Sequence, residues 1–110
     1  MMYLIEILPQ AKHDLEETLE YLSEHSPDAA NRWFQDWLDC CDTLREAAGS
    51  FGLAPENSIA EFTVQQFVFR SGRRRYRVIY RVVCFTVYVY HKRGPGQDWV
   101  KVLEKTLPNG

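Results

Sequence analysis

Three scarcities in the sequence narrow the class of protein. Only three of the 110 residues are cysteines, Cys40, Cys41 and Cys84, and their number and spacing provide neither a disulfide framework nor a zinc motif. No apolar run approaches the roughly 20 residues that a membrane-spanning helix needs. The first ten residues, MMYLIEILPQ, lack the basic segment and cleavage site of a secretion signal. We therefore expect a cytoplasmic protein with no metal, cofactor or membrane contact.

Acidic residues are also missing from one long part of the chain. Residues 62–97 contain eight Lys and Arg residues and no Asp or Glu, a local charge of +8. Residues 1–46 contain eleven acidic residues and three basic ones, a local charge of −8, although the whole chain carries only −2. Such asymmetry indicates an acidic or polyanionic partner and says nothing about the fold.

The periodicity of apolar residues predicts a strand followed by two helices. Residues 2–8 favour a strand that Pro9 stops, and residues 10–25 have the i, i+4, i+7 pattern of an amphipathic helix. Ser26 is placed as an N-cap and Pro27 as the first residue of a second helix that runs to about Ala48 and ends at Gly49. The short connection predicts an antiparallel helical hairpin.

The second helix has a wide apolar stripe, and its buried residues are predicted to be Ala30, Trp33, Phe34, Trp37, Leu38, Cys41 and Leu44. Because Cys40 and Cys41 are adjacent, we expect only one of them to face the interior. Residues 49–61 are a loop by composition.

The rest of the chain predicts strands at residues 62–70, 74–83 and 85–92, joined by Ser71-Gly72-Arg73 and by a tight turn near Cys84. Short connections make these strands an antiparallel meander, and the N-terminal strand is the natural fourth member of the sheet. A short helix or tail follows at about residues 98–106. The expected fold class is α+β, in a single domain over residues 1–110.

The stretch RSGRRRYRVIYRV, residues 70–82, contains six arginines. Alternation places Tyr76, Val78, Tyr80 and Val82 on a buried face, and it places Arg75, Arg77, Ile79, Arg81 and Val83 on an open one. One interpretation is that these arginines pair with the acidic helices and keep the sheet soluble. The other is a surface that recognises anions, because the arginine fork suits phosphate and carboxylate.

The order of several motifs resembles the RelE/ParE superfamily of type II toxins, especially its ParE-like plasmid-stabilisation branch. These motifs are SPDAANRWFQDWL, the loop GLAPE, YRVIYRV and TVYVYHKRGPGQDW. The resemblance implies a growth-inhibiting toxin that a cognate antitoxin neutralises, with operator DNA bound only through the antitoxin. Two targets are usual in the superfamily: DNA gyrase for ParE-like members, and messenger RNA in the ribosomal A site for RelE-like members. An inactive or regulatory relative is the third alternative.

The resemblance also suggests site residues. Arg77 matches the strand arginine of the family and Arg93 its last-strand basic position, where Gly94 follows in place of a frequent histidine. With His91, which we place on the face of Phe85, Val87 and Val89, these two arginines are the candidates for a nuclease site. His91 is alternatively a packed residue at a strand end. The predicted surface for the antitoxin or target comprises Arg73, Arg75, Arg77, Arg81, Arg93 and Trp99. Trp99 either packs the tail and contacts the antitoxin or stacks on a nucleotide. Gyrase binding is the favoured activity, because the chain as a whole is acidic, with a pI of about 5.9.

Overall fold

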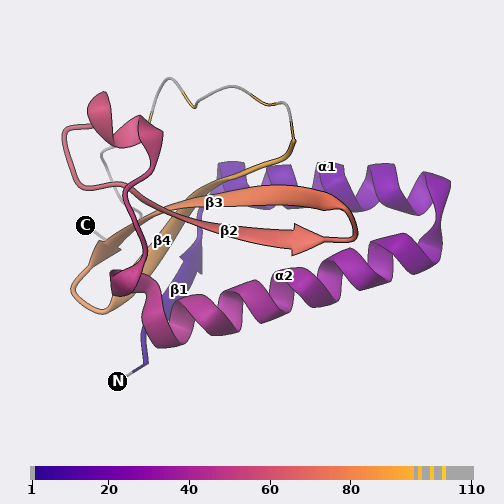
Figure 1. Cartoon of the computed structure of the whole chain (residues 1–110), viewed down its shortest axis with the longest axis horizontal. Helices are drawn as coiled ribbons and strands as arrows, with labels where there is room; N and C mark the ends of the chain where they lie inside the picture. Colours follow the sequence, from indigo (N-terminus) through magenta and orange to yellow (C-terminus); the bar gives the residue numbers. More distant parts are fainter. Residues whose placement is uncertain (1, 96, 98–99, 101–102, 104–110) are drawn as a thin grey trace.

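The computed structural model of the protein describes residues 2–95, 97, 100 and 103. It is an α+β fold in which two helices cover one face of a four-stranded sheet (Figure 1). In chain order the helices and strands are β1 (Leu4–Ile7), α1 (Pro9–His25), α2 (Pro27–Ala47), β2 (Gln65–Ser71), β3 (Arg74–Val83) and β4 (Thr86–Arg93). The predicted order of a strand, a helical hairpin and a meander is confirmed.

Capping residues determine where the helical hairpin turns. The Ser26 hydroxyl oxygen accepts a hydrogen bond from the Ala29 backbone N–H at 3.2 Å, and Pro27 is the first residue of α2. The Ser26 N–H in turn donates to Leu22 O at the end of α1. One residue therefore ends one helix and caps the next, so the helices must fold back on each other.

The sheet has the strand order β1-β4-β3-β2, and it is mixed because β1 pairs with β4 in parallel. The β2-β3-β4 meander is antiparallel, as predicted. The helical hairpin returns the chain to the start of β1, where the Tyr3 N–H donates to Arg45 O at 2.7 Å. The meander then reverses direction twice. As a consequence, β4 runs in the same direction as β1.

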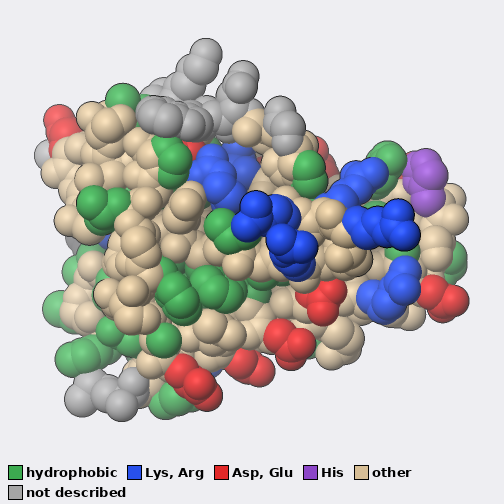
Figure 2. Space-filling model, in the orientation of Figure 1, with side chains coloured by type: hydrophobic (Ala, Val, Ile, Leu, Met, Phe, Trp, Pro, Cys, Tyr) green, Lys and Arg blue, Asp and Glu red, His purple; other side chains and the backbone are tan. Residues whose placement is uncertain are grey.

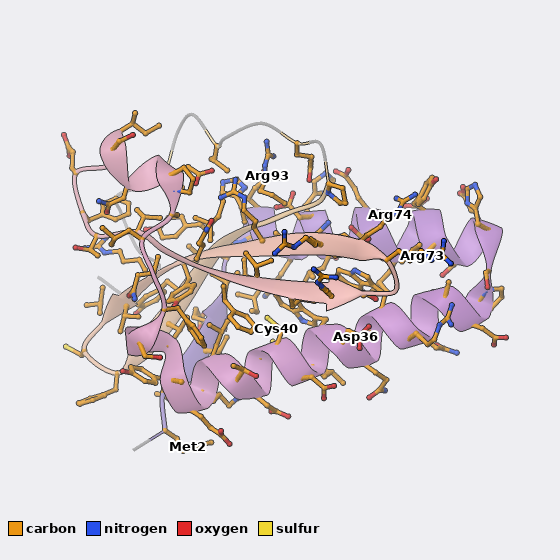
Figure 3. All side chains as sticks on the ribbon, viewed as in Figure 1. Met2, Asp36, Cys40, Arg73, Arg74 and Arg93 are labelled. Atoms are coloured by element: carbon orange, nitrogen blue, oxygen red, sulfur yellow. The ribbon has the colours of Figure 1, made fainter. Side chains whose placement is uncertain are left out.

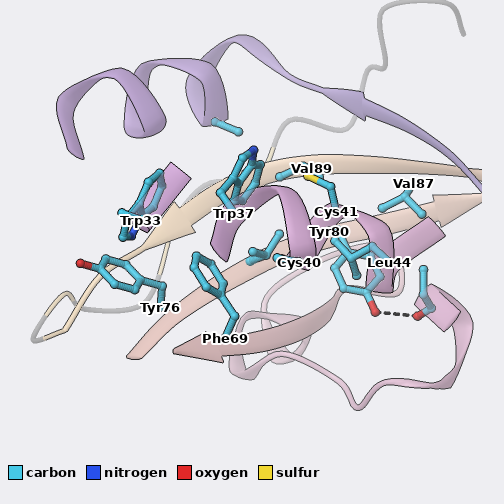
Figure 4. Close-up of a cluster of buried hydrophobic side chains, with 13 residues drawn as sticks. Trp33, Trp37, Cys40, Cys41, Leu44, Phe69, Tyr76, Tyr80, Val87 and Val89 are labelled. Atoms are coloured by element: carbon cyan, nitrogen blue, oxygen red, sulfur yellow. Dashed lines mark hydrogen bonds between the residues drawn. The ribbon is translucent and has the colours of Figure 1, made fainter. Parts of the chain in front are cut away.

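The core lies between the helices and the sheet and is rich in aromatic side chains (Figure 4). Trp33, Trp37, Tyr76, Val78 and Tyr80 are all buried, as predicted. The Trp33 ring meets the Tyr76 ring edge-on, with centroids 5.6 Å apart. The Tyr80 hydroxyl donates to the carbonyl of residue 48 at 2.6 Å, which ties the end of α2 to the sheet. The large buried rings thus fix how the hairpin sits on the sheet.

The buried stripe of α2 differs from the prediction in two respects. Phe34 and Leu38 are 42% and 40% exposed, whereas Cys40 and Cys41 are both buried. Successive helical residues are about 100° apart, and the buried arc runs from Cys40 through Trp37 to Cys41. The two cysteines are therefore the borders of one arc, and both reach the core. Phe34 and Leu38 lie beyond the Cys41 border.

The second face of β3 is not the open stripe that alternation predicted. Ile79 on this face has no exposed surface and packs with Ala54, Val64 and Val100. The covering segment follows α2 and contains two short 3₁₀ helices, Ala48–Ser50 and Pro55–Ser58. A second small core therefore lies on this side of the sheet, whereas at the β2–β3 end Arg70 and Arg75 are exposed in the described part of the chain.

The expected helix near residues 98–106 and Trp99 lie outside the described residues. Among the residues that the structure describes, no helix is both long and apolar enough to cross a membrane. Within the same ranges, no group of three or more His, Cys, Asp and Glu side chains is arranged to hold a metal ion.

Candidate functional site

Arg77, in the middle of β3, forms a bidentate ion pair with Glu56 from the covering segment. Its two terminal nitrogens lie 3.0 and 2.9 Å from the two carboxylate oxygens of Glu56, and Nη1 also donates to Gln66 Oε1 at 3.0 Å. Glu56 is completely buried, and its Oε2 accepts a further hydrogen bond from the Val100 N–H at 2.9 Å. The Arg77 fork is thus largely occupied by groups of the protein itself.

The surroundings of Glu56 keep its carboxylate ionised despite burial. Burial by itself raises the pKa of Glu56. The hydrogen bonds from Arg77 and Val100 and the charge of Arg77 lower it by more than burial raises it, so that the net pKa lies below its usual value. A buried, paired carboxylate and guanidinium together carry no net charge. The Glu56–Arg77 pair is therefore a weak source of positive potential compared with a free arginine.

Sequence reasoning missed Glu56. It located carboxylates for the arginines in the helices, whereas the partner of Arg77 comes from the loop GLAPE. An acidic residue in the loop GLAPE was the available signal, and residues 49–61 were predicted only to form a loop, with no contact to the sheet. The partner became visible only once that loop covered the sheet.

Two other predicted arginines share the face of Arg77. Arg93 lies directly opposite Arg77 across β3 and β4, so the structure does bring the two family positions together. The Arg81 guanidinium stacks over the Phe62 ring at 4.3 Å from its centroid. Both Arg81 and Arg93 have interaction partners in the protein. These three arginines are partly buried and lie on the same face of the sheet as Ile79.

His91 does not share a face with Val87 and Val89, contrary to the prediction. A register shift at Ile79 and Tyr80 pairs Tyr80 with Val89 but Ile79 with His91, which moves His91 to the face of Ile79. The cause is a β-bulge, which adds one residue to β4 and reverses the alternation beyond it.

The side chain of His91 lies near Asp14 of α1, with Nδ1 and Asp14 Oδ2 3.5 Å apart. Asp14 also accepts from the Lys92 N–H and from Gln10 Nε2, each at 3.1 Å. Burial raises the pKa of Asp14, and the hydrogen bonds from Gln10 and Lys92 together with the nearby His91 lower it to a net value below the usual range. Asp14 thus joins α1 to the end of β4.

Four accessible arginines lie at the β2–β3 hairpin, which Figure 2 shows as a gathering of Lys and Arg side chains. Arg70, Arg73, Arg74 and Arg75 are all exposed and form no ion pair with any described residue. Arg70 lies directly opposite Arg75 across the two strands. Like charges in that position repel. Arg73 and Arg74 lie at the tip (Figure 3). We call Arg70, Arg73 and Arg75 the arginine surface.

A strand, a helical hairpin and an antiparallel meander with a basic hairpin define a small α+β domain of the kind found in the RelE/ParE superfamily of type II toxins. Residues 5–95 match the family described as ParE toxin of type II toxin-antitoxin system, parDE. The chain therefore belongs to this toxin family, whose members act with an antitoxin partner. No curated protein matches the chain.

Proposed function

We propose that this protein is the growth-inhibiting toxin of a plasmid-stabilisation system, that it acts by binding DNA gyrase, and that a cognate antitoxin neutralises it. Membership of the ParE toxin family supports this proposal. The engagement of Arg77 by Glu56 is the structural observation that favours gyrase binding over RNA cleavage.

Cleavage of RNA by its 2′-hydroxyl needs a proton acceptor, a proton donor and stabilisation of charge at one phosphate. At least three of the five N–H donors of Arg77 are engaged by Glu56 and Gln66. The Arg77 charge is also neutralised by a carboxylate in direct contact. An arginine in this state is better suited to stabilising the fold than to stabilising charge on a phosphate in the transition state.

Binding to a protein target, by contrast, requires accessible charge, and the arginine surface supplies it. Repulsion between Arg70 and Arg75 is relieved when a carboxylate or another anion binds between them. We propose that Arg73 and Arg75 form the centre of the target-binding surface, with Arg70 beside them. Arg77, Arg81 and Arg93 adjoin it on the same face of the sheet, and Trp99 belongs to the proposed surface from the sequence alone.

The test is to add the purified toxin to DNA gyrase in a supercoiling assay and to induce the toxin in cells. We expect loss of supercoiling, a DNA-damage response and intact messenger RNA. His91→Ala should remain toxic. Codon-dependent cleavage of messenger RNA within minutes of induction, abolished by Arg93→Ala in a folded protein, would instead establish a ribosome-dependent nuclease.

A matched pair of variants tests the surface. Arg73→Ala with Arg75→Ala should lower the inhibition of gyrase at least about tenfold if these residues lie in the contact. Lys12→Ala with Arg45→Ala removes the same charge from the helical side and should change inhibition less than about threefold. Equal effects of the two pairs would mean that only net charge matters.

A further inference from the structure

A cleft lies between the helical hairpin and the start of β3, on the opposite side of the sheet from Arg75 and Arg77. It consists of two adjoining pockets of about 310 and 190 Å³, which share the side chains of Leu22, Arg74 and Tyr76. We call it the hairpin cleft. Figure 3 places Arg74 at its β-hairpin end, beside α1.

Lys92 of β4 lines the larger pocket and is only 6% exposed. Its ammonium group donates to Thr18 Oγ1 and lies 5.6 and 5.2 Å from the ring centroids of Trp33 and Tyr76. It forms no ion pair with a carboxylate of any described residue. An ammonium has three donors, so the interactions of the protein itself satisfy this buried cation only in part. Burial lowers the pKa of Lys92, the charges of Asp14 and Glu17 raise it, and the net pKa lies below its usual value.

The two acidic residues of the cleft are already engaged elsewhere. Asp14 accepts from Gln10 and from the Lys92 backbone, and it lies beside His91. Glu17 faces His13, with Oε1 and Nε2 2.5 Å apart. Neither carboxylate forms an ion pair with the Lys92 ammonium, although both charges act on it from a longer distance.

Cations and donors of the cleft, by contrast, remain unpaired within the described part of the chain. Arg32, Arg73 and Arg74 line it and form no ion pair with any residue that the structure describes. Trp33, which lines the smaller pocket, has a buried indole N–H for which the described residues provide no acceptor. The hairpin cleft therefore offers several donors without an ion-pair partner, whereas its own carboxylates, Asp14 and Glu17, are engaged by other residues.

We propose that the hairpin cleft binds an acidic side chain of the antitoxin, whose carboxylate pairs with Lys92 and Arg74 while a neighbouring apolar side chain packs on Leu22 and Tyr76. The identification of the partner as an antitoxin rests on the proposed function. A single carboxylate fits better than a phosphate because Asp14 and Glu17 flank the larger pocket and repel a dianion. The volume of the larger pocket, about 310 Å³, is at the lower end of the range for ligand sites.

Arg74 and Arg75 provide a matched test, because they are adjacent exposed arginines on opposite faces of β3 and only Arg74 lines the cleft. The probe is the protein encoded beside the toxin gene that suppresses its toxicity, titrated calorimetrically into each toxin variant. Arg74→Ala should weaken binding at least about tenfold, and Arg75→Ala less than about threefold.

Lys92→Met keeps the apolar stem and removes the charge, and should weaken binding at least about 30-fold. Replacing the antitoxin's acidic residues one by one with their amides should identify one carboxylate whose loss has no added effect in the Lys92→Met background. In cells, Lys92→Met should remain toxic and resist neutralisation. Thermal melting establishes whether Lys92→Met is folded. If Lys92→Met does not fold, Arg74→Ala serves as the test of the cleft.

Unchanged affinity of folded Lys92→Met and Arg74→Ala for the antitoxin would overturn the inference, while gyrase inhibition would still support the proposed function. A wild-type toxin that no neighbouring protein neutralises would remove both the antitoxin partner and this inference. Binding of a single-stranded RNA 12-mer that Lys92→Met abolishes would show that the occupant is a nucleic acid, and would also overturn it.

Discussion

Glu56 connects three parts of the chain that are distant in sequence. Its carboxylate binds Arg77 in the centre of the sheet and the backbone of Val100 in the tail, and it projects from the segment that covers Ile79. Desolvation makes such a buried ion pair a poor source of net stability, but removal of one partner leaves the other charge uncompensated. Glu56 therefore acts mainly by fixing one position of the covering segment.

Glu56→Gln should lower the free energy of unfolding by about 3 kcal/mol, because it leaves the largely buried Arg77 charge without its carboxylate. Chemical denaturation at neutral pH measures the change. Glu20→Gln, the same substitution at an exposed position of α1, is the control and should stay within about 0.5 kcal/mol. A loss as small as that of the control would mean that water replaces the Glu56 carboxylate without cost.

The stability difference between the wild type and Glu56→Gln should also depend on pH. The folded-state pKa of Glu56 lies below its usual value of 4.5, so the ionised carboxylate stabilises the fold fully above that pH. This contribution is lost as the pH falls through the folded-state pKa. Denaturation curves should therefore show a constant difference at neutral pH that shrinks below about pH 4.5. A difference that grows on acidification would contradict the lowered pKa.

At the residue scale, the sequence predicted which side chains are buried better than it predicted their interaction partners. Alternation correctly placed Tyr76, Val78 and Tyr80 in the core, because it depends only on the local geometry of a strand. The partner of Arg77 depends on how a distant loop folds. The face of His91 depends on a β-bulge, and no periodicity in the sequence marked it.

At the scale of elements, the connections were predicted where local chemistry determines them. Ser26 and Pro27 start α2 through interactions within one turn, so their signal is readable in the sequence. The parallel pairing of β1 follows from the topology of the whole chain. The burial of both Cys40 and Cys41 follows from the width of the α2 contact, and a pattern that assumes one narrow stripe underestimates it.

The turn between β3 and β4 contains a further element-scale feature, because Cys84 has a φ of 55°. This left-handed conformation costs a residue with a side chain about 1–2 kcal/mol relative to glycine. Glycine, however, loses more entropy on folding. Cys84→Gly should therefore stabilise the protein by about 0.5–1 kcal/mol, measured by thermal or chemical denaturation.

Cys84→Ala is the matched control for this turn. It removes the thiol but keeps the Cβ atom and the strain, so its stability should equal that of the wild type within about 0.5 kcal/mol. An equal gain in both variants would show that the thiol, and not the backbone conformation, is unfavourable.

At the scale of the whole molecule, the charge asymmetry of the sequence becomes a separation in space. The helices that carry most of the acidic residues cover one face of the sheet, and the arginine surface lies at the β2–β3 hairpin, with Arg70 and Arg75 on the other face and Arg73 in the turn. Such a charge distribution orients the molecule as it approaches an acidic target and increases the rate of association. The charge asymmetry should therefore affect the association rate with an acidic partner as much as the affinity for it.

The association rate of the toxin with gyrase should consequently fall about tenfold or more between about 50 and 500 mM NaCl, because salt screens exposed charges beyond a few ångströms. The dissociation rate should change much less. Arg73→Ala with Arg75→Ala should slow association at low salt and flatten its salt dependence, whereas Lys12→Ala with Arg45→Ala should not. Stopped-flow or surface-binding kinetics measure both rates. If the wild type associates at the same rate across this range, the arginine surface does not steer the encounter, and its charges serve only to keep that end of the sheet solvated.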